Sequence, residues 1–336
     1  MATDRVLPAA KPAAALPPEI WPLTTQAGAD GGLSVGGVPL AEIAARYGTP
    51  AYVLDEDDVR TRCRQYREAF GDAEVAYAGQ AFLCRAMTRW VHEEGLSLAV
   101  CSEGELAVAG FPAERILLHG NAKTPGDLRA ALACGVGRIV VDSPGEIARI
   151  AALIPALGPS RQRVLVQVTP GADPHVHPAV TAGAEDRRFG FPLASGAAAD
   201  GVHRILAQPE LELAGLHYHL GSQTTGQEAV EIAARRLADL MAVIRAEHGV
   251  ILPELNLGGG HGVRYSEDDQ DVDLAASAVR IRAAVRSACA SMRLPVPRLT
   301  IEPGRPIVSR AAVTLYRVVS LKHLDAGRAV VPSMAG

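Results

Sequence analysis

Residues 97–120 read SLAVCSEGELAVAGFPAERILLHG, and this stretch carries the pattern that decides the fold. A short apolar run at 97–100 is followed by a segment of helical character that begins at Glu103, and then by a second apolar run at 115–120. Short apolar runs separated by helical segments predict the strands of a parallel sheet joined by helices. The stretch therefore reads as one unit of an α/β repeat.

The same unit recurs along most of the chain. Strands are expected at 74–79, 97–100, 115–120, 138–143, 163–168, 212–222, 254–260 and 298–304, with long helices at about 227–247 and 273–291. Eight strands of this kind predict a (β/α)8 TIM-like barrel, and the alternative is an open doubly wound sheet. The barrel is favoured because unusual residues follow nearly every strand, and in a barrel those strand ends meet on one face. In addition, no GxGxxG motif follows the first strand.

The bulk composition excludes several classes of protein. The chain has 336 residues, 48% hydrophobic and 21% charged, and a net charge of −4 without a basic stripe for nucleic acid. We expect no membrane span, no secretory signal, and scattered free cysteines in a reducing, cytoplasmic compartment. There are only three lysines, Lys11, Lys123 and Lys322, so any lysine chemistry has few candidates.

Two adjacent strand ends carry residues suited to a phosphate group. The strand at 254–260 ends in Gly258, Gly259 and Gly260, and consecutive glycines let backbone N–H groups turn toward an anion. The next strand runs into Glu302-Pro-Gly-Arg305, and arginine adds a fork of donors. A glycine triplet alone is also compatible with a plain turn. The two strand ends together predict a phosphate site, because barrels usually bind phosphate there.

Two histidines end the strand at 212–222. Alternation places His217 and His219 on the same face of that strand. They are either core histidines or metal ligands, and His175 and His177 in a proline-rich loop have the same ambiguity. No third ligand at suitable spacing is evident nearby, so no metal site is predicted.

The motifs now identify a family resemblance. GTPAYVLDEDDVR, YAGQAFLCRAM, HGNAKT, RRFGF, GLHYHLGSQ, NLGGG and IEPGR occur in the order found in diaminopimelate decarboxylases, most closely those of the actinobacterial type. These enzymes resemble alanine racemase in their barrel and use pyridoxal 5′-phosphate (PLP). The resemblance covers about residues 20–322.

The resemblance implies roles for particular residues. His219 would stack on the pyridine ring, and Glu302 would face the pyridine nitrogen and keep it protonated, so that the ring draws off electrons when CO₂ leaves. The phosphate would be bound by Ser222, by Gly258–Gly260 and by Arg305. Arg188 stands where the family usually has a lysine.

Two departures affect the reaction centre. The family motif Tyr-Ala-x-Lys-Ala carries the lysine that forms the Schiff base with the cofactor, and this chain has Gln80 there. A carboxamide cannot form that imine, so PLP is expected to bind non-covalently. Ala99 stands where the family has an aspartate near that lysine, so both members of a charge pair are absent. Lys123, beside the catalytic lysine in the family, is the candidate substitute.

The resemblance also divides the chain. We expect a flexible tail at 1–20, the N-terminal segment of a β domain at 21–55, and the PLP-binding barrel at 56–310. Residues 311–336 would be the truncated start of the C-terminal β domain, which in the family carries a catalytic cysteine and completes the site across a dimer. A homodimer, or a heterodimer with an intact paralogue, is the expected assembly.

Two functions remain open at this point. One is a decarboxylase of lysine biosynthesis that converts an amino acid, meso-diaminopimelate by family, to L-lysine and CO₂, catalytically impaired in this chain. The alternative is a pseudoenzyme subunit that binds PLP or a partner without catalysis. A damaged gene or an incomplete chain is a third reading.

Overall fold

The computed structural model describes residues 16–17, 19–157, 161–169, 189–219, 227–266, 269, 272–318, 322–323 and 329–330. Contacts divide the chain into two compact units. One, here called the barrel unit, comprises Arg62–Val263 and Asp271–Ile307, and the other comprises Met1–Thr61, Arg264–Gln270 and Val308–Gly336. The domain boundaries expected from the sequence stay a prediction. None of the described helices is long and apolar enough to cross a membrane.

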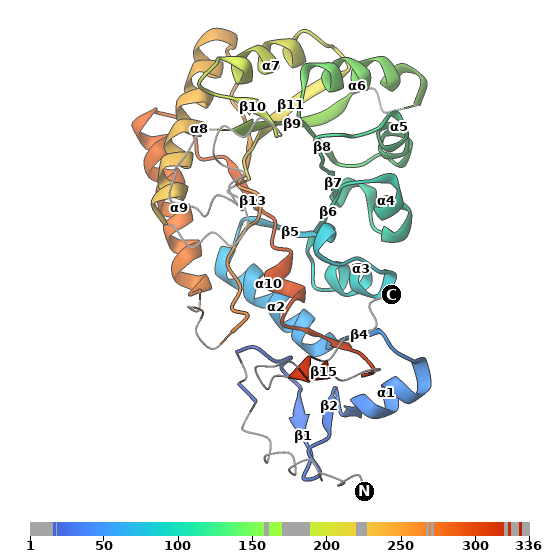
Figure 1. Ribbon diagram of the computed structural model, residues 1–336. Helices are drawn as coiled ribbons and strands as arrows, with labels where there is room; N and C mark the ends of the chain where they lie inside the picture. Colours follow the sequence, from blue (N-terminus) through green and yellow to red (C-terminus); the bar gives the residue numbers. More distant parts are fainter. Residues whose placement is uncertain are drawn as a thin grey trace, which may run out of the picture. The chain divides into compact units, whose positions relative to one another are not determined.

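The barrel unit is built on eight parallel strands among the described residues (Figure 1). They are β5 (Glu74–Ala78), β6 (Ser97–Val100), β7 (Ile116–Leu118), β8 (Arg138–Val141), β9 (Gln162–Thr169), β11 (Leu211–His217), β12 (Glu254–Asn256) and β13 (Arg298–Ile301). Each strand pairs with the next, and β13 pairs with β5, which closes the ring. The short strand β10 (Phe191–Pro192) pairs with β9. The predicted TIM-like fold is therefore confirmed, and the open sheet is excluded.

Helices lie outside this ring (Figure 1). They are α3 (Arg85–Glu93), α4 (Glu103–Ala109), α5 (Pro125–Cys134), α6 (Pro144–Leu157), α7 (Ala197–Leu206), α8 (Gln227–His248) and α9 (Leu274–Ser291). Helix α2 (Glu56–Phe70) precedes β5, and the short α10 (Arg305–Val308) follows β13. Local sequence fixes α5 at both ends: Thr124 and Asp127 form a capping box, Pro125 takes the first helical position, and Gly135 ends the helix at φ 76°.

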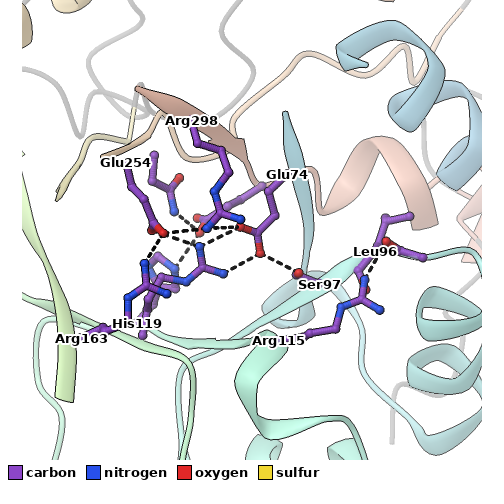
Figure 2. A network of polar contacts seen from close by, with 12 residues as sticks. Glu74, Leu96, Ser97, Arg115, His119, Arg163, Glu254 and Arg298 are labelled. Carbon is purple, nitrogen blue, oxygen red and sulfur yellow. Dashed lines mark hydrogen bonds and ion pairs between the residues drawn. The ribbon is translucent and has the colours of Figure 1, made fainter. Parts of the chain in front are cut away.

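Inward-facing side chains form layers, because every second residue of a strand points into the barrel. At the amino ends of the strands, charged residues form a connected network (Figure 2). Arg138 bonds Glu74 at 2.5–2.7 Å and Glu254 at 3.1 Å, and Arg163 and Arg298 also bond Glu254. Further along β5, β6, β7, β8, β9 and β11 lies an apolar layer, which includes Ala76, Ala99, Leu117, Val140, Leu165 and Ala214. The charges and the apolar layer fill the barrel below the strand ends.

The other unit contains short elements: β1 (Gln26–Ala27), β2 (Leu33–Val35), β3 (Val38–Pro39), α1 (Leu40–Tyr47), β4 (Ala51–Leu54), β14 (Ala312–Leu315), β15 (Lys322–His323) and β16 (Ala329–Val330). β1, β2 and β3 form one antiparallel sheet, and β4 pairs with β14, so segments far apart in sequence share a sheet. The expected tail at 1–20 lies almost wholly outside the described residues.

Most barrel strands end earlier than their apolar patterns predicted. β12 stops at Asn256 instead of residue 260, and β13 stops at Ile301 instead of residue 304. The pattern continues past each strand because the following residues are buried as well, and some still bond their neighbours: Leu257 N–H donates to Thr300 O at 2.9 Å and Glu302 N–H to Gly258 O at 2.7 Å. The residues that follow these strands form the rim of a cavity.

Candidate active site

A cavity of about 410 Å³ opens at the carboxyl ends of the barrel strands. Inward-facing residues just beyond the apolar layer line it, such as Gln80 after β5, Cys101 after β6, His119 after β7 and Glu302 after β13. Because all eight strands run parallel, these ends converge on one face of the barrel.

Glu302 is buried at this cavity and surrounded by polar groups. Its Oε1 accepts a hydrogen bond from Asn256 Nδ2 at 2.8 Å and lies 2.7 Å from His119 Nε2, and its Oε2 lies 3.6 Å from His217 Nε2. Burial alone would raise the pKa of Glu302, but the rings of His119 and His217 hold that pKa well below its usual range. The carboxylate therefore stays ionised at neutral pH and suits a cationic partner.

The histidine rings around this carboxylate are buried polar groups. Neither ring nitrogen of His217, nor His119 Nε2, makes a hydrogen bond of good geometry to a described group. Burial, opposed by Glu302, lowers the pKa of His217. Ligand atoms of His119, His217 and Glu302 lie within 4.8 Å of one another, a set that could also hold a metal ion. The sequence did not indicate this set because its members come from three different strand ends, whereas the pair considered there, His217 and His219, lies on one strand and was not predicted to bind a metal.

Two further histidines line the cavity as neutral rings. Burial and the neighbouring His217 lower the pKa of His219 to about 4, and burial alone lowers that of His261 to about 4. Tyr66 of α2 fixes His261: its hydroxyl lies 3.1 Å from Nδ1 and its ring stacks at 5.7 Å. A flat, neutral imidazole such as His219 offers a face for an aromatic ligand.

The glycine triplet allows neighbouring strand ends to approach closely. A Cβ on Gly258, at φ +63°, would lie 2.8 Å from Tyr218 O, and one on Gly259 would lie 2.2 Å from Glu302 O. Gly258 N–H donates to Asn256 Oδ1 at 2.8 Å. Gly259 and Gly260 line the cavity together with Arg305, whereas Gly258 is not among the described lining residues. Gly260 and Arg305 are therefore better placed for an anion than Gly258.

The wall beyond β5 and β6 carries no amine among the described residues. Gln80 sits in a single 3-10 turn (Gly79–Ala81), and its Oε1 accepts a contact from Cys101 Sγ at 3.8 Å. Burial, then Glu105 and Glu302, raises the pKa of the Cys101 thiol to about 12, so the thiol stays protonated. Ala99 lines the same wall.

Lys123 forms a buried ion pair with Glu146 of α6. Its side chain is fully buried, with Nζ 2.5 Å from Glu146 Oε1 and donating to Gly120 O at 2.5 Å. Lys123 is not among the described residues that line the cavity. Its ammonium therefore ties the loop after β7 to α6 and does not face a ligand in the cavity.

The structure brings together most of the residues singled out from sequence. Gln80, His219, Gly259, Gly260, Glu302 and Arg305 all line the cavity. Ser222, Arg188, His175, His177 and Lys11 lie outside the described residues. Sequence reasoning missed His119, Asn256 and His261. A count of every second residue through each strand end would have indicated His119, two residues beyond the inward-facing Leu117, and Asn256, two residues before Gly258.

An α/β barrel whose strand ends carry a buried carboxylate, histidine rings and a glycine turn around one cavity is suited to bind an aromatic, anionic cofactor. A sequence profile for the pyridoxal-binding domain of pyridoxal-dependent decarboxylases matches residues 56–309, and the chain belongs to this family. The decarboxylase chemistry of the family depends on pyridoxal phosphate.

Relatives narrow the assignment to diaminopimelate decarboxylases. The chain is 54% identical to the diaminopimelate decarboxylase of Actinosynnema pretiosum subsp. auranticum over 92% of its own length and 69% of the relative. It is 43% identical to that of Mycobacterium bovis over 92% and 71%. The crystal structure of the M. jannaschii enzyme superposes with a TM-score of 0.82 at 28% identity, covering 90% of this chain and 71% of that one. The chain is thus a diaminopimelate decarboxylase-like protein.

The residues present fit the cofactor in part. The ionised Glu302 suits a protonated pyridine nitrogen, and Gly259 allows a close backbone turn at the cavity, because a Cβ there would lie 2.2 Å from Glu302 O. The amide of Gln80 does not fit a covalent bond to the cofactor aldehyde.

Proposed function

We propose that this chain binds pyridoxal phosphate non-covalently and is an impaired member of the diaminopimelate decarboxylases. Glu302 holds the pyridine nitrogen, His219 lies against the ring, and Gly259, Gly260 and Arg305 bind the phosphate, with Gly258 shaping the turn behind them. Ser222 is a further phosphate ligand on the family resemblance alone. The cofactor, when bound, accepts the electrons released as CO₂ leaves the amino acid.

One observation carries the proposal. Gln80 occupies the cavity wall where the family has its lysine, while Lys123 is buried against Glu146. Without a placed acid–base amine, we expect turnover to fall by at least roughly 10²–10⁴, the contribution of one positioned proton-transfer group. The substrate class follows from the relatives: a diamino dicarboxylic acid such as meso-diaminopimelate. A related M. jannaschii enzyme, 29% identical, was crystallised with L-lysine.

Reductive trapping tests the proposal. The full chain is incubated with pyridoxal phosphate, treated with borohydride and digested for mass spectrometry, while equilibrium dialysis measures cofactor binding separately. We expect bound cofactor with no adduct on Lys123, and an adduct on residue 80 in the Gln80→Lys variant. The Gln80→Met variant is the control, because it lacks both the amide and an amine. An adduct on Lys123, or brisk CO₂ release by the unmodified chain, contradicts the proposal.

The second candidate is a non-catalytic subunit, and the joint absence of an amine at Gln80 and a carboxylate at Ala99 favours it. Losing both members of a charge pair leaves no unpaired buried charge, so the site can persist without catalysis. A homodimer, or a dimer with an intact paralogue, is the proposed assembly. Sedimentation of the chain alone tests the homodimer, and sedimentation of the chain mixed with an intact diaminopimelate decarboxylase tests the mixed dimer; only monomers in both experiments contradict the proposed assembly.

A further inference from the structure

The orientation of the cofactor follows from its own chemistry, and the inference below rests on the binding mode proposed above. In pyridoxal phosphate the carbon that carries the aldehyde lies opposite the ring nitrogen, and the phosphate arm is on the adjacent carbon. If the nitrogen faces Glu302, the phosphate lies at Gly260 and Arg305, and Gln80 stands at the lysine position of the family, the aldehyde carbon lies against the wall after β5 and β6. That wall carries Gln80 and Cys101.

We propose that Gln80 makes this site select the amine form of the cofactor, pyridoxamine 5′-phosphate, over the aldehyde form. In a lysine-bearing site the aldehyde gains a covalent bond, and a second ammonium beside the lysine would be repelled. Replacing the lysine by an amide removes both effects at once. The amine form thereby becomes a better ligand than the aldehyde form for the wall made by Gln80 and Cys101.

The charges around this wall favour a cation. After burial, the charge of Glu105 contributes most to the raised pKa of the Cys101 thiol, whereas Glu302 is paired with the ring nitrogen in the proposed binding mode. Glu105 is held at the wall, because its Oε2 accepts the Cys101 N–H at 2.7 Å. The ammonium of Lys123 is directed at Glu146 instead. An ammonium on the ligand therefore enters a negative local field, whereas an aldehyde gains nothing from it.

Hydrogen bonding acts in the same direction. The Gln80 carbonyl oxygen has two lone pairs, and the Cys101 thiol, 3.8 Å away, is a weak donor that uses one of them. A primary ammonium can donate to the other, which gives a charge-assisted bond about twice as strong as a neutral one. An aldehyde can only accept a neutral bond from the Gln80 amide nitrogen.

The backbone keeps Gln80 in this position. The short turn Gly79–Ala81 follows β5 directly, and a Cβ added to Gly79 would lie 3.0 Å from Ala99 O. The turn is thus packed against the end of β6 (Ser97–Val100), which Cys101 follows directly. Gln80 and Cys101 therefore form one surface after β5 and β6, next to the end of β13 that carries Glu302.

Calorimetric titration of the full chain tests the preference in amine-free buffer. The ligands are pyridoxamine 5′-phosphate, pyridoxal 5′-phosphate and 4-deoxypyridoxine 5′-phosphate, which shares the ring and phosphate but has only a methyl group at the tested position. We expect the amine form to bind about tenfold more tightly than the other two, which corresponds to about 1.4 kcal/mol.

Two variants assign the preference to residue 80. Gln80→Met removes the acceptor, so the amine form should lose most of its advantage while the 4-deoxy ligand binds as before. Gln80→Lys should reverse the order, because its ammonium repels the amine form and bonds the aldehyde. Equal binding of all three ligands, or tighter binding of the aldehyde form to the unmodified chain, overturns the inference and leaves the proposed function standing. Failure of all three ligands to bind overturns the proposed function itself.

Discussion

The Lys123→Met variant gives the sharpest test of how this barrel uses its one buried lysine. Lys123 is fully buried, its partner Glu146 is 2% exposed, and their charged atoms are 2.5 Å apart. Removing the lysine leaves a carboxylate buried without its partner, which typically costs about 3–5 kcal/mol. With a urea slope near the upper end of about 1–3 kcal/mol per molar, the unfolding midpoint should fall by about 1–2 M.

A second substitution separates the charge from the packing. Adding Glu146→Gln to Lys123→Met removes the unpaired charge, while the amide oxygen can still accept the Asp142 N–H that Glu146 now accepts at 3.0 Å. The double variant should recover about half or more of the lost stability. Arg89→Met breaks an exposed pair with Glu93, 3.9 Å apart, and is the matched control with an expected cost of about 0–1 kcal/mol.

Urea unfolding followed by circular dichroism measures all of these variants. The reasoning is refuted if Lys123→Met unfolds at the same urea concentration as the unmodified chain. It is also refuted if the double variant is no more stable than the single one. Either result would mean that the lysine is not committed to Glu146 and is free to serve the cavity.

Three other predictions follow from the same contacts. Gly259→Ala should abolish cofactor binding in dialysis and destabilise the fold, because its Cβ would lie 2.2 Å from a backbone oxygen, whereas Gly145→Ala, with open space around it, should do neither. Burial chiefly raises the pKa of Asp142 to about 6, so ionisation of this carboxyl destabilises the folded state increasingly as pH rises from about 4 to 6. Asp142→Asn should therefore raise the melting temperature at pH 7.5 but not at pH 3.5. Burial opposes ionisation of Glu254, but the surrounding arginines hold its pKa below the usual value, so it stabilises the fold above about pH 4.5 and that contribution is lost as pH falls further. Glu254→Gln should lower the melting temperature at pH 7 and reduce its decline in acid.

Part of the cavity lining was readable from sequence because polar residues follow the predicted strands and match motifs of the family. Glu302 after β13 and Gln80 after β5 were singled out in this way, and both line the cavity, while their roles stay predictions. The sequence predicted the carboxyl ends of the strands less accurately, because β12 and β13 stop several residues before their apolar runs end. Burial and single backbone hydrogen bonds, such as Leu257 N–H to Thr300 O, continue into the cavity rim, so an apolar pattern does not mark where the regular ladder ends.

The sequence by itself determined the barrel and the absence of an amine at Gln80, because both depend on residue type and spacing along one chain. Only the tertiary structure decided that His119 and His217 flank Glu302 and that Lys123 belongs to Glu146. Such contacts join residues from different strands and helices, and closure of the ring sets their distances. No local pattern encodes which of several polar side chains at a strand end will meet across the barrel.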